Sequence, residues 1–296
     1  MNILREENIL SSNTNANLSL EDIAVCVFTS ALNLPERALS VHTTWLRKFP
    51  KGYLIGGYYY NPKLKMIALG DGVEEDYQSA TKKQFLGLIE LHKRFPDSKL
   101  YFITGCDAYI FSENLRNLLS EYDYDEDYLI GGQCGDIVIN GERVIYPGGG
   151  PGFAISHSLV AKISPRLPSF VEEWERTQDE YKSACDAAMA YLLQHEYGVK
   201  LTFRDGFYSG PPYDYPKFPY KDGNGNEIYK PVIDHPMAFH GLSIREMYVL
   251  DRTGWLRKKT HLDRGFDKIS RFFTGKRKTK TIVNLVSRLL YGHRFL

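Results

Sequence analysis

An apolar run leads directly into an acidic residue in the stretch Leu100-Tyr-Phe-Ile-Thr-Gly-Cys-Asp107. A short continuous apolar run is typical of a β-strand that is buried on both faces, as in parallel sheets covered by helices. The run therefore predicts a strand over 100–103 that ends at Gly105-Cys106-Asp107. Because open α/β sheets bind ligands beyond the carboxyl ends of their strands, Asp107 is a candidate functional residue. The ordinary alternative is a turn or helix-capping aspartate.

Strand-like and helix-like segments alternate along most of the chain. Apolar runs predict further strands at 23–28, 53–55, 66–69, 128–130 and 153–155. Helices are predicted from Pro35 to about Arg47, over about 78–95, over 113–122 with Ser112 as cap, and from Ser183 to Gly198. This alternation predicts an α/β fold with a mostly parallel central sheet.

Charge is distributed unevenly along the 296 residues. The net charge is only +1, yet residues 252–296 contain 13 lysines and arginines against two aspartates. An acidic body with a basic tail suits a domain that touches something anionic through its C-terminus. We predict a flexible leader at 1–20, one globular domain at 21–251 and a basic tail at 252–296.

The tail has the pattern of an amphipathic helix. Its apolar residues recur at helical spacing beside the basic run Lys276-Arg-Lys-Thr-Lys280; they are Ile282, Leu285, Val286, Leu289 and Leu290. Such a helix could dock on the acidic surface of its own domain or lie on an anionic membrane, and the sequence leaves both alternatives open.

Composition excludes several classes of protein. Hydrophobic residues at 43% and charged residues at 25% are typical of a globular chain. The N-terminus resembles no signal peptide, no apolar run is long enough to span a membrane, and the four cysteines form no CxxC pair. We therefore expect a cytoplasmic protein, with the tail as a candidate for peripheral membrane contact. Nucleic-acid binding is not expected, because the body is acidic and no recognition module is visible.

Three further segments carry candidate functional residues. The run Gly148-Gly-Gly-Pro-Gly152 would let the backbone approach a ligand closely, although a tight turn would need the same residues. Asp186 falls in the first turn of the helix capped by Ser183, where the helix dipole favours the charged carboxylate. His240 follows Met237-Ala-Phe, and a core histidine is the ordinary alternative.

Taken in order, these segments resemble the inverting GT-A glycosyltransferases of the Fringe and core-1 β-1,3-galactosyltransferase group, glycosyltransferase family 31. The similarity covers about residues 23–250. Six elements carry it, in chain order. The first three are Val27-Phe-Thr-Ser30 with Thr44-Trp45 (first strand and Thr-Trp helix), Leu100 to Ile110 (strand with an acidic triplet) and Asn114 to Tyr122 (the helix behind it). The others are Gly149-Gly-Pro-Gly-Phe-Ala-Ile-Ser156 (Gly-Gly-Ala-Gly-Phe/Tyr segment), Asp186 (the (Glu/Asp)-Asp pair that opens a helix), and Phe239-His240 with Met247-Tyr248 (Ser-Phe-His…Met-Tyr element).

The resemblance implies a GT-A (Rossmann-like) fold and an inverting transfer of a hexose or N-acetylhexosamine. The donor would be a UDP-sugar, the acceptor a glycan or glycoprotein hydroxyl, and the expected linkage β-1,3. Mn²⁺ or another divalent metal would be held by Asp107 and His240, and Asp186 would be the general base. The implied donor-binding residues are Thr29, Lys82, Cys106, Gly149 and Gly150. Tyr208 and Tyr213, in the Pro/Tyr/Gly-rich loop 207–233, would border the acceptor.

The chain departs from the family pattern at two carboxylates. Its acidic triplet is reduced to Gly105-Cys106-Asp107, and Cys185 replaces the first acid of the (Glu/Asp)-Asp pair. We interpret both cysteines as small apolar replacements, with a thiolate contact to metal as the lesser alternative. The departures motivate a second hypothesis, a protein that keeps the fold and binds a nucleotide-sugar or glycan without catalysis. The presence of both Asp186 and His240 favours the enzyme.

Overall fold

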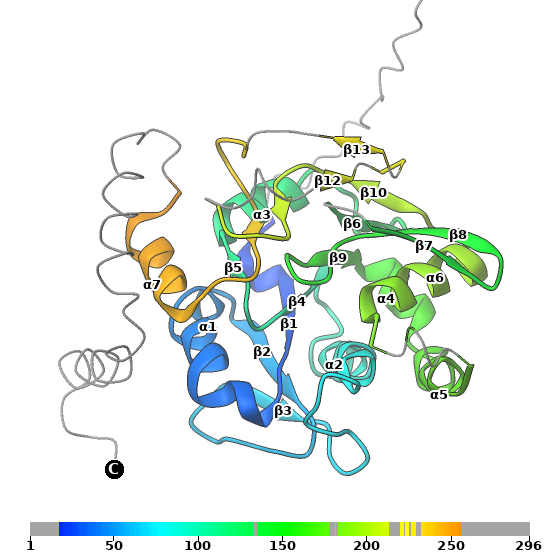
Figure 1. The fold of residues 1–296 in the computed structure, drawn as a ribbon, viewed down its shortest axis with the longest axis horizontal. Helices are drawn as coiled ribbons and strands as arrows, with labels where there is room; N and C mark the ends of the chain where they lie inside the picture. Colours follow the sequence, from blue (N-terminus) through cyan, green and yellow to red (C-terminus); the bar gives the residue numbers. More distant parts are fainter. Residues whose placement is uncertain are drawn as a thin grey trace, which may run out of the picture. The chain divides into compact units, whose positions relative to one another are not determined.

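A seven-stranded sheet organises the chain in the computed structural model, which describes residues 18–132, 135–177, 181, 183–212, 220–221, 223–224, 226–228 and 232–255. In spatial order the strands are β10 (Leu201–Phe203), β6 (Leu129–Gly131), β9 (Phe153–Ser156), β4 (Leu100–Gly105), β1 (Ile23–Phe28), β2 (Lys51–Gly56) and β3 (Met66–Ala68). Neighbouring strands are parallel except in the two pairs that involve β9. The predicted α/β fold with a mostly parallel sheet is confirmed, and it is consistent with a GT-A fold (Figure 1).

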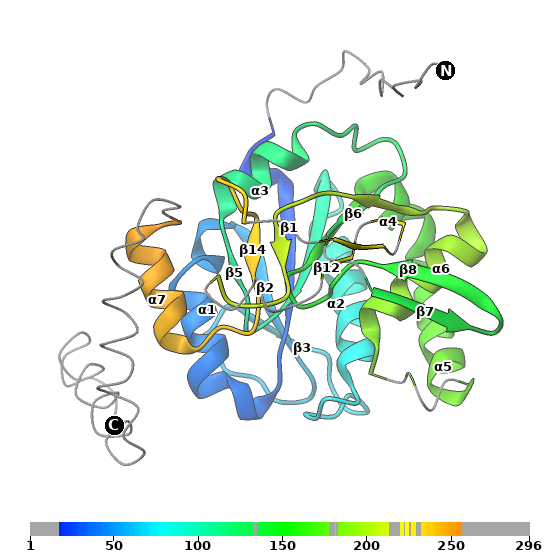
Figure 2. The ribbon, with the colours of Figure 1, turned by 45° about the horizontal axis from the view of Figure 1, so that its top comes forward.

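Helices cover both faces of this sheet (Figure 2). Along β1, Ile23, Val25 and Val27 pack into one apolar cluster, whereas Ala24 and Cys26 pack into the other. The first cluster includes residues of α1 (Leu39–Thr43), α3 (Ser112–Leu119) and α7 (Ile244–Thr253). The second includes residues of α2 (Ala80–Arg94), α4 (His157–Ile163), α5 (Leu167–Thr177) and α6 (Cys185–Tyr197). Burial on both faces explains why the strand sequences are continuously apolar.

Shorter elements complete the described chain. A three-stranded sheet contains β5 (Tyr109–Ile110), β14 (Ala238–Phe239) and β11 (Phe207–Tyr208), while β7 (Gly135–Ile139) pairs with β8 (Glu142–Tyr146) and β12 (Tyr220–Lys221) with β13 (Glu227–Ile228). Single turns of 3₁₀-helix lie at Leu20–Asp22, Ala31–Asn33 and Leu46–Lys48, and a π-helical turn lies at Leu34–Ala38. The helix predicted from Pro35 is therefore broken into three parts. Ser112 is the first residue of α3, not its cap.

The ends of the chain contribute little to the described structure. The chain divides into a unit that ends at Trp255 and a second unit at 256–296, and the second lies outside the described residues. The predicted amphipathic tail and residues 1–17 of the predicted leader also lie outside them. Within the described ranges, no helix combines the length and apolar character needed to cross a bilayer.

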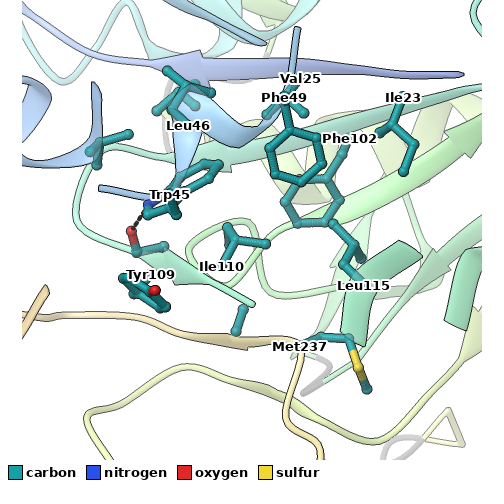
Figure 3. Packing of buried hydrophobic residues seen from close by; sticks show 14 of the residues in the cluster. Ile23, Val25, Trp45, Leu46, Phe49, Phe102, Tyr109, Ile110, Leu115 and Met237 are labelled. Carbon is teal, nitrogen blue, oxygen red and sulfur yellow. Dashed lines mark hydrogen bonds between the residues drawn. The ribbon is translucent and has the colours of Figure 1, made fainter. Parts of the chain in front are cut away.

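Trp45 connects the first apolar cluster to the loop that follows β4. Its side chain is fully buried and meets the ring of Phe49 edge-on, with ring centroids 6.2 Å apart. The indole N–H donates a hydrogen bond of 2.8 Å to the carbonyl of Ala108 (Figure 3). Because Ala108 directly follows Asp107, this bond fixes the chain at the point where the candidate carboxylate leaves the sheet.

Replacing Trp45 with Phe should lower the free energy of unfolding by about 1–3 kcal/mol, because the Ala108 carbonyl loses its donor and the smaller ring leaves a void. Urea denaturation measures the change. Trp174→Phe is the matched control. It removes the same ring volume, but the hydrogen bond that is lost is longer: the Trp174 indole N–H donates to the carbonyl of Tyr181 at 3.3 Å. An unchanged urea midpoint in Trp45→Phe would contradict the role given to this hydrogen bond.

Candidate functional site

Most of the candidate residues meet where the parallel strands β1 and β4 end. Strand β9 runs the opposite way between β4 and β6, so the glycine run that precedes β9 lies at the same edge of the sheet. A cavity of about 860 Å³ opens there, which is within the usual size range of ligand-binding pockets. Its lining includes these candidates: Thr29, Cys106, Asp107, Gly149, Gly150, Asp186 and His240.

Asp107 and His240 form a pair inside this cavity. The Nε2 of His240 lies 3.0 Å from Oδ1 of Asp107, and Arg37 lies 3.5 Å from the other carboxylate oxygen. The backbone supports the pair, since the N–H of Leu242 donates to the Asp107 carbonyl at 3.0 Å. Burial alone would raise the pKa of Asp107, but the hydrogen bond and charge of His240, with Arg37, lower it. Burial would likewise lower the pKa of His240, but Asp107 raises it. A carboxylate oxygen and an imidazole nitrogen therefore lie within hydrogen-bonding distance of each other in the cavity.

Asp186 lies on another wall of the same cavity, in the first turn of α6. Its Oδ2 accepts a hydrogen bond of 2.8 Å from the N–H of Gly149, and its Oδ1 accepts one of 2.9 Å from Ala187. The expected cap was wrong, because α6 begins at Cys185 with Ala184 as its N-cap, while Ser183 lies in the preceding turn. Burial raises the pKa of Asp186, although the backbone N–H groups lower it. The sequence suggested that the helix end favours the charged form of this carboxylate. In the structure burial outweighs that effect, and the pKa of Asp186 is raised.

The glycine run packs directly against both groups. A Cβ built on Gly150 would lie 2.5 Å from the imidazole of His240, and one built on Gly149 would lie 3.0 Å from the Cβ of Asp186. No larger residue fits at Gly150 without moving the ring. The glycines therefore allow the backbone to approach the two candidate side chains.

Two predicted site residues lie away from the cavity lining, and a third lies outside the described residues. Lys82 points elsewhere and pairs with Glu175 at 2.9 Å. Tyr208 is buried in the core, where its ring stacks on Phe239 with centroids 5.3 Å apart. Tyr213 lies outside the described residues.

The chain is similar in sequence to known glycosyltransferases. A family model described as Fringe-like matches residues 18–211. The chain belongs to the Fringe-like family. It is 24% identical over 207 residues to the β-1,3-N-acetylglucosaminyltransferase lunatic fringe of Danio rerio, covering 65% of this chain and 55% of the relative. It is 28% identical over 153 residues to the chondroitin sulfate glucuronyltransferase of Homo sapiens, covering 50% of this chain and 19% of the relative. The chain thus spans about half of the first relative and a fifth of the second.

A buried ion pair forms one side of the Fringe-like cavity, and sequence reasoning missed it. The Nζ of Lys83 lies 3.5 Å from Oε2 of Glu75, with the two side chains 2% and 8% exposed. The same carboxylate accepts hydrogen bonds of 2.9 Å from the N–H groups of Ala31 and Tyr59. Burial lowers the pKa of Lys83, while the charge of Glu75 raises it. Glu75 thus connects α2 to the loops that follow β1 and β2.

One sequence signal could have separated Lys83 from Lys82. Gly87 lies one helical turn after Lys83, and a Cβ there would lie 2.9 Å from Ile55 of β2. A glycine inside a helix marks close approach to a neighbouring element, so Lys83 shares the face that meets the sheet.

The two cysteines that replace family carboxylates are buried at the cavity wall. Burial raises the pKa of Cys106 to about 11 and holds the pKa of Cys185 well above its usual value. Both thiols are therefore neutral near pH 7, in agreement with their interpretation as small apolar replacements.

Glu75→Gln should lower the free energy of unfolding by about 3–5 kcal/mol, because it removes the carboxylate that is paired with the buried Lys83 cation. Chemical denaturation measures the loss. Glu90→Gln is the control: it breaks the exposed pair with Lys93, and its effect should stay within about 0.5 kcal/mol. Similar losses in the two variants would show that burial of the Glu75–Lys83 pair has no energetic consequence.

Proposed function

We propose that this Fringe-like protein is a glycosyltransferase that moves a hexose or N-acetylhexosamine from a UDP-sugar to a hydroxyl of a glycan or glycoprotein, with inversion. The observation that carries the proposal is that one cavity holds the Asp186 carboxylate on one wall and the Asp107–His240 pair on another. The names of both relatives describe transfer of a sugar, and that of the Danio rerio protein supports a β-1,3 linkage.

The Asp107–His240 pair suits a divalent cation such as Mn²⁺. A carboxylate oxygen and an imidazole nitrogen are ligands that this ion accepts, and the two atoms lie 3.0 Å apart. The described residues contain no group of three or more His, Cys, Asp or Glu side chains that could hold a metal. Asp107 and His240 would be its protein ligands, and a substrate diphosphate would supply further oxygen ligands. When bound, the ion supplies positive charge next to the departing diphosphate.

Asp186 acts as the general base of the proposed reaction. Its carboxylate takes the proton from the acceptor hydroxyl, whose oxygen forms a bond to the anomeric carbon from the face opposite UDP. The bond between that carbon and the diphosphate oxygen breaks, and UDP leaves with the electron pair. A single displacement of this kind needs no carboxylate nucleophile. The raised pKa of Asp186 makes it a stronger base than an exposed aspartate.

Asp107→Asn and His240→Ala should each weaken Mn²⁺-dependent binding of UDP by about tenfold or more, because the first removes the negative charge of one ligand of the ion and the second removes the other ligand. Isothermal titration calorimetry with UDP, with and without Mn²⁺, measures the effect. Binding of UDP in the absence of the ion is the internal control. Unchanged Mn²⁺-dependent affinity in both variants would exclude this pair as the metal site.

Asp186→Asn should lower turnover by about 10²-fold or more with donor affinity nearly unchanged, because it removes the base and keeps the size of the side chain. UDP release from a panel of UDP-sugars with candidate acceptors measures this. Activity of the wild type should fall as the pH falls through the raised pKa of Asp186, since only the ionised carboxylate accepts a proton.

Asp205→Asn is the matched control, because it makes the same change at an aspartate that is not placed in the cavity lining. Wild-type turnover in Asp186→Asn would move the base elsewhere. Binding of a UDP-sugar with no UDP release under any condition would favour the second hypothesis, a binding protein without catalytic activity.

A further inference from the structure

Two strongly exposed apolar side chains lie at the cavity. Of the large hydrophobic side chains in the described ranges, Leu32 (84% exposed) and Tyr77 (75% exposed) are the most exposed, and both line the cavity. Exposed apolar groups gathered at a concave site mark a surface that a ligand covers. Tyr77 is the more informative of the two, because an aromatic ring can stack on a flat apolar face and its hydroxyl can form hydrogen bonds.

The backbone that carries Tyr77 is held firmly. On one side, the buried Glu75 carboxylate binds the N–H groups of Ala31 and Tyr59 at 2.9 Å. On the other side, the hydroxyl of Ser79 donates to a carbonyl of the same loop at 2.6 Å, and α2 begins one residue later. The exposure of the Tyr77 ring is therefore a property of a fixed loop that presents the ring to the cavity.

Tyr77 lies near both chemical groups of the proposed site. It shares the cavity lining with Asp107 and Asp186. Although the side chain as a whole is mostly exposed, partial burial and then the neighbouring Cys185, Asp186 and Asp107 raise the pKa of the Tyr77 hydroxyl. The side chain is thus close to the base and also close to the diphosphate-binding pair.

The position of Tyr77 indicates which part of the substrate would lie beside it. In a direct displacement the anomeric carbon lies between the acceptor oxygen, which is bound to the base, and the diphosphate oxygen that leaves. A group near Asp186 and Asp107 together therefore faces the sugar that is transferred. The acceptor would adjoin Asp186 alone, and the nucleoside would lie beyond the diphosphate.

We propose that Tyr77 binds the transferred sugar of the donor, with its ring stacked on the apolar face of the pyranose. This inference rests on the proposed glycosyltransferase function and names a residue of its donor site that the sequence did not indicate.

The test compares the affinities of UDP and of a UDP-sugar in the presence of Mn²⁺ by calorimetry. The probe is the tightest binder to the wild type among UDP-glucose, UDP-galactose, UDP-N-acetylglucosamine and UDP-glucuronic acid. Tyr77→Ala should weaken binding of the UDP-sugar by about 3- to 10-fold, the range of a stacked aromatic contact, and leave UDP affinity unchanged. Tyr77→Phe should retain most of the affinity, because it keeps the ring.

Tyr60→Ala is the matched control, since Tyr60 is 56% exposed but is not placed in the cavity lining. It should change neither affinity. Equal weakening of UDP and UDP-sugar by Tyr77→Ala would overturn the proposal in favour of a nucleotide contact. Unchanged donor affinity with a raised KM for the acceptor would overturn it in favour of an acceptor contact. Failure of the proposed function has a different signature: the wild type then binds none of the nucleotides, and the inference falls with it.

Discussion

The reversed direction of β9 determines how the site is assembled. In a purely parallel sheet the chain returns to the carboxyl edge only at strand ends, so glycine-rich turns before strands would lie at the opposite edge. Because β9 is antiparallel to both β4 and β6, its beginning meets the end of β4, with Phe153 opposite Ile103. The glycine run is thereby placed between the residues after β4 and the start of α6. The contacts of the glycine run with Asp186 and His240 depend on this one strand direction, whereas the pairing of β14 with β5 brings His240 to Asp107.

A second level of order comes from buried polar groups. The Trp45 indole donates a hydrogen bond to the carbonyl of Ala108. The Glu75 carboxylate accepts hydrogen bonds from two backbone N–H groups and forms an ion pair with Lys83. The Ala108 carbonyl gains a buried hydrogen bond, and the buried Glu75 carboxylate gains two donors and an opposite charge, which offsets the cost of burying these polar groups. Ala108 directly follows the cavity-lining Asp107, and Glu75 and Lys83 line the cavity themselves, so the same interactions that stabilise the fold also hold the walls of the cavity.

The sheet could be predicted well from sequence alone, because strands that are buried on both faces have uninterrupted apolar sequences. The strands at 23–28 and 100–103 and the position of Asp107 after β4 follow from that pattern. Features decided by a single helical position or by tertiary contacts were not predicted. Lys82 and Lys83 are chemically identical, and only packing of Gly87 against Ile55 distinguishes them. Tyrosine is a residue type that can bind sugars, yet the side chain of Tyr208 is buried in the core, where it stacks on Phe239. The raised pKa of Asp186 likewise comes from surrounding protein that no local motif encodes.

The contact of Gly150 with His240 has an entropic consequence. The backbone of Gly150 lies so close to the imidazole of His240 that no Cβ fits between them. The ring therefore has little freedom to rotate about its side-chain torsions. A second restraint comes from the carbonyl of Ser209, which lies 3.3 Å from Nδ1 and favours the orientation with Nε2 toward Asp107. The loss of rotational freedom of this imidazole is thus incurred when the chain folds, before any ligand arrives. A ligand that meets the pair finds it already oriented, and more of the interaction energy remains for binding.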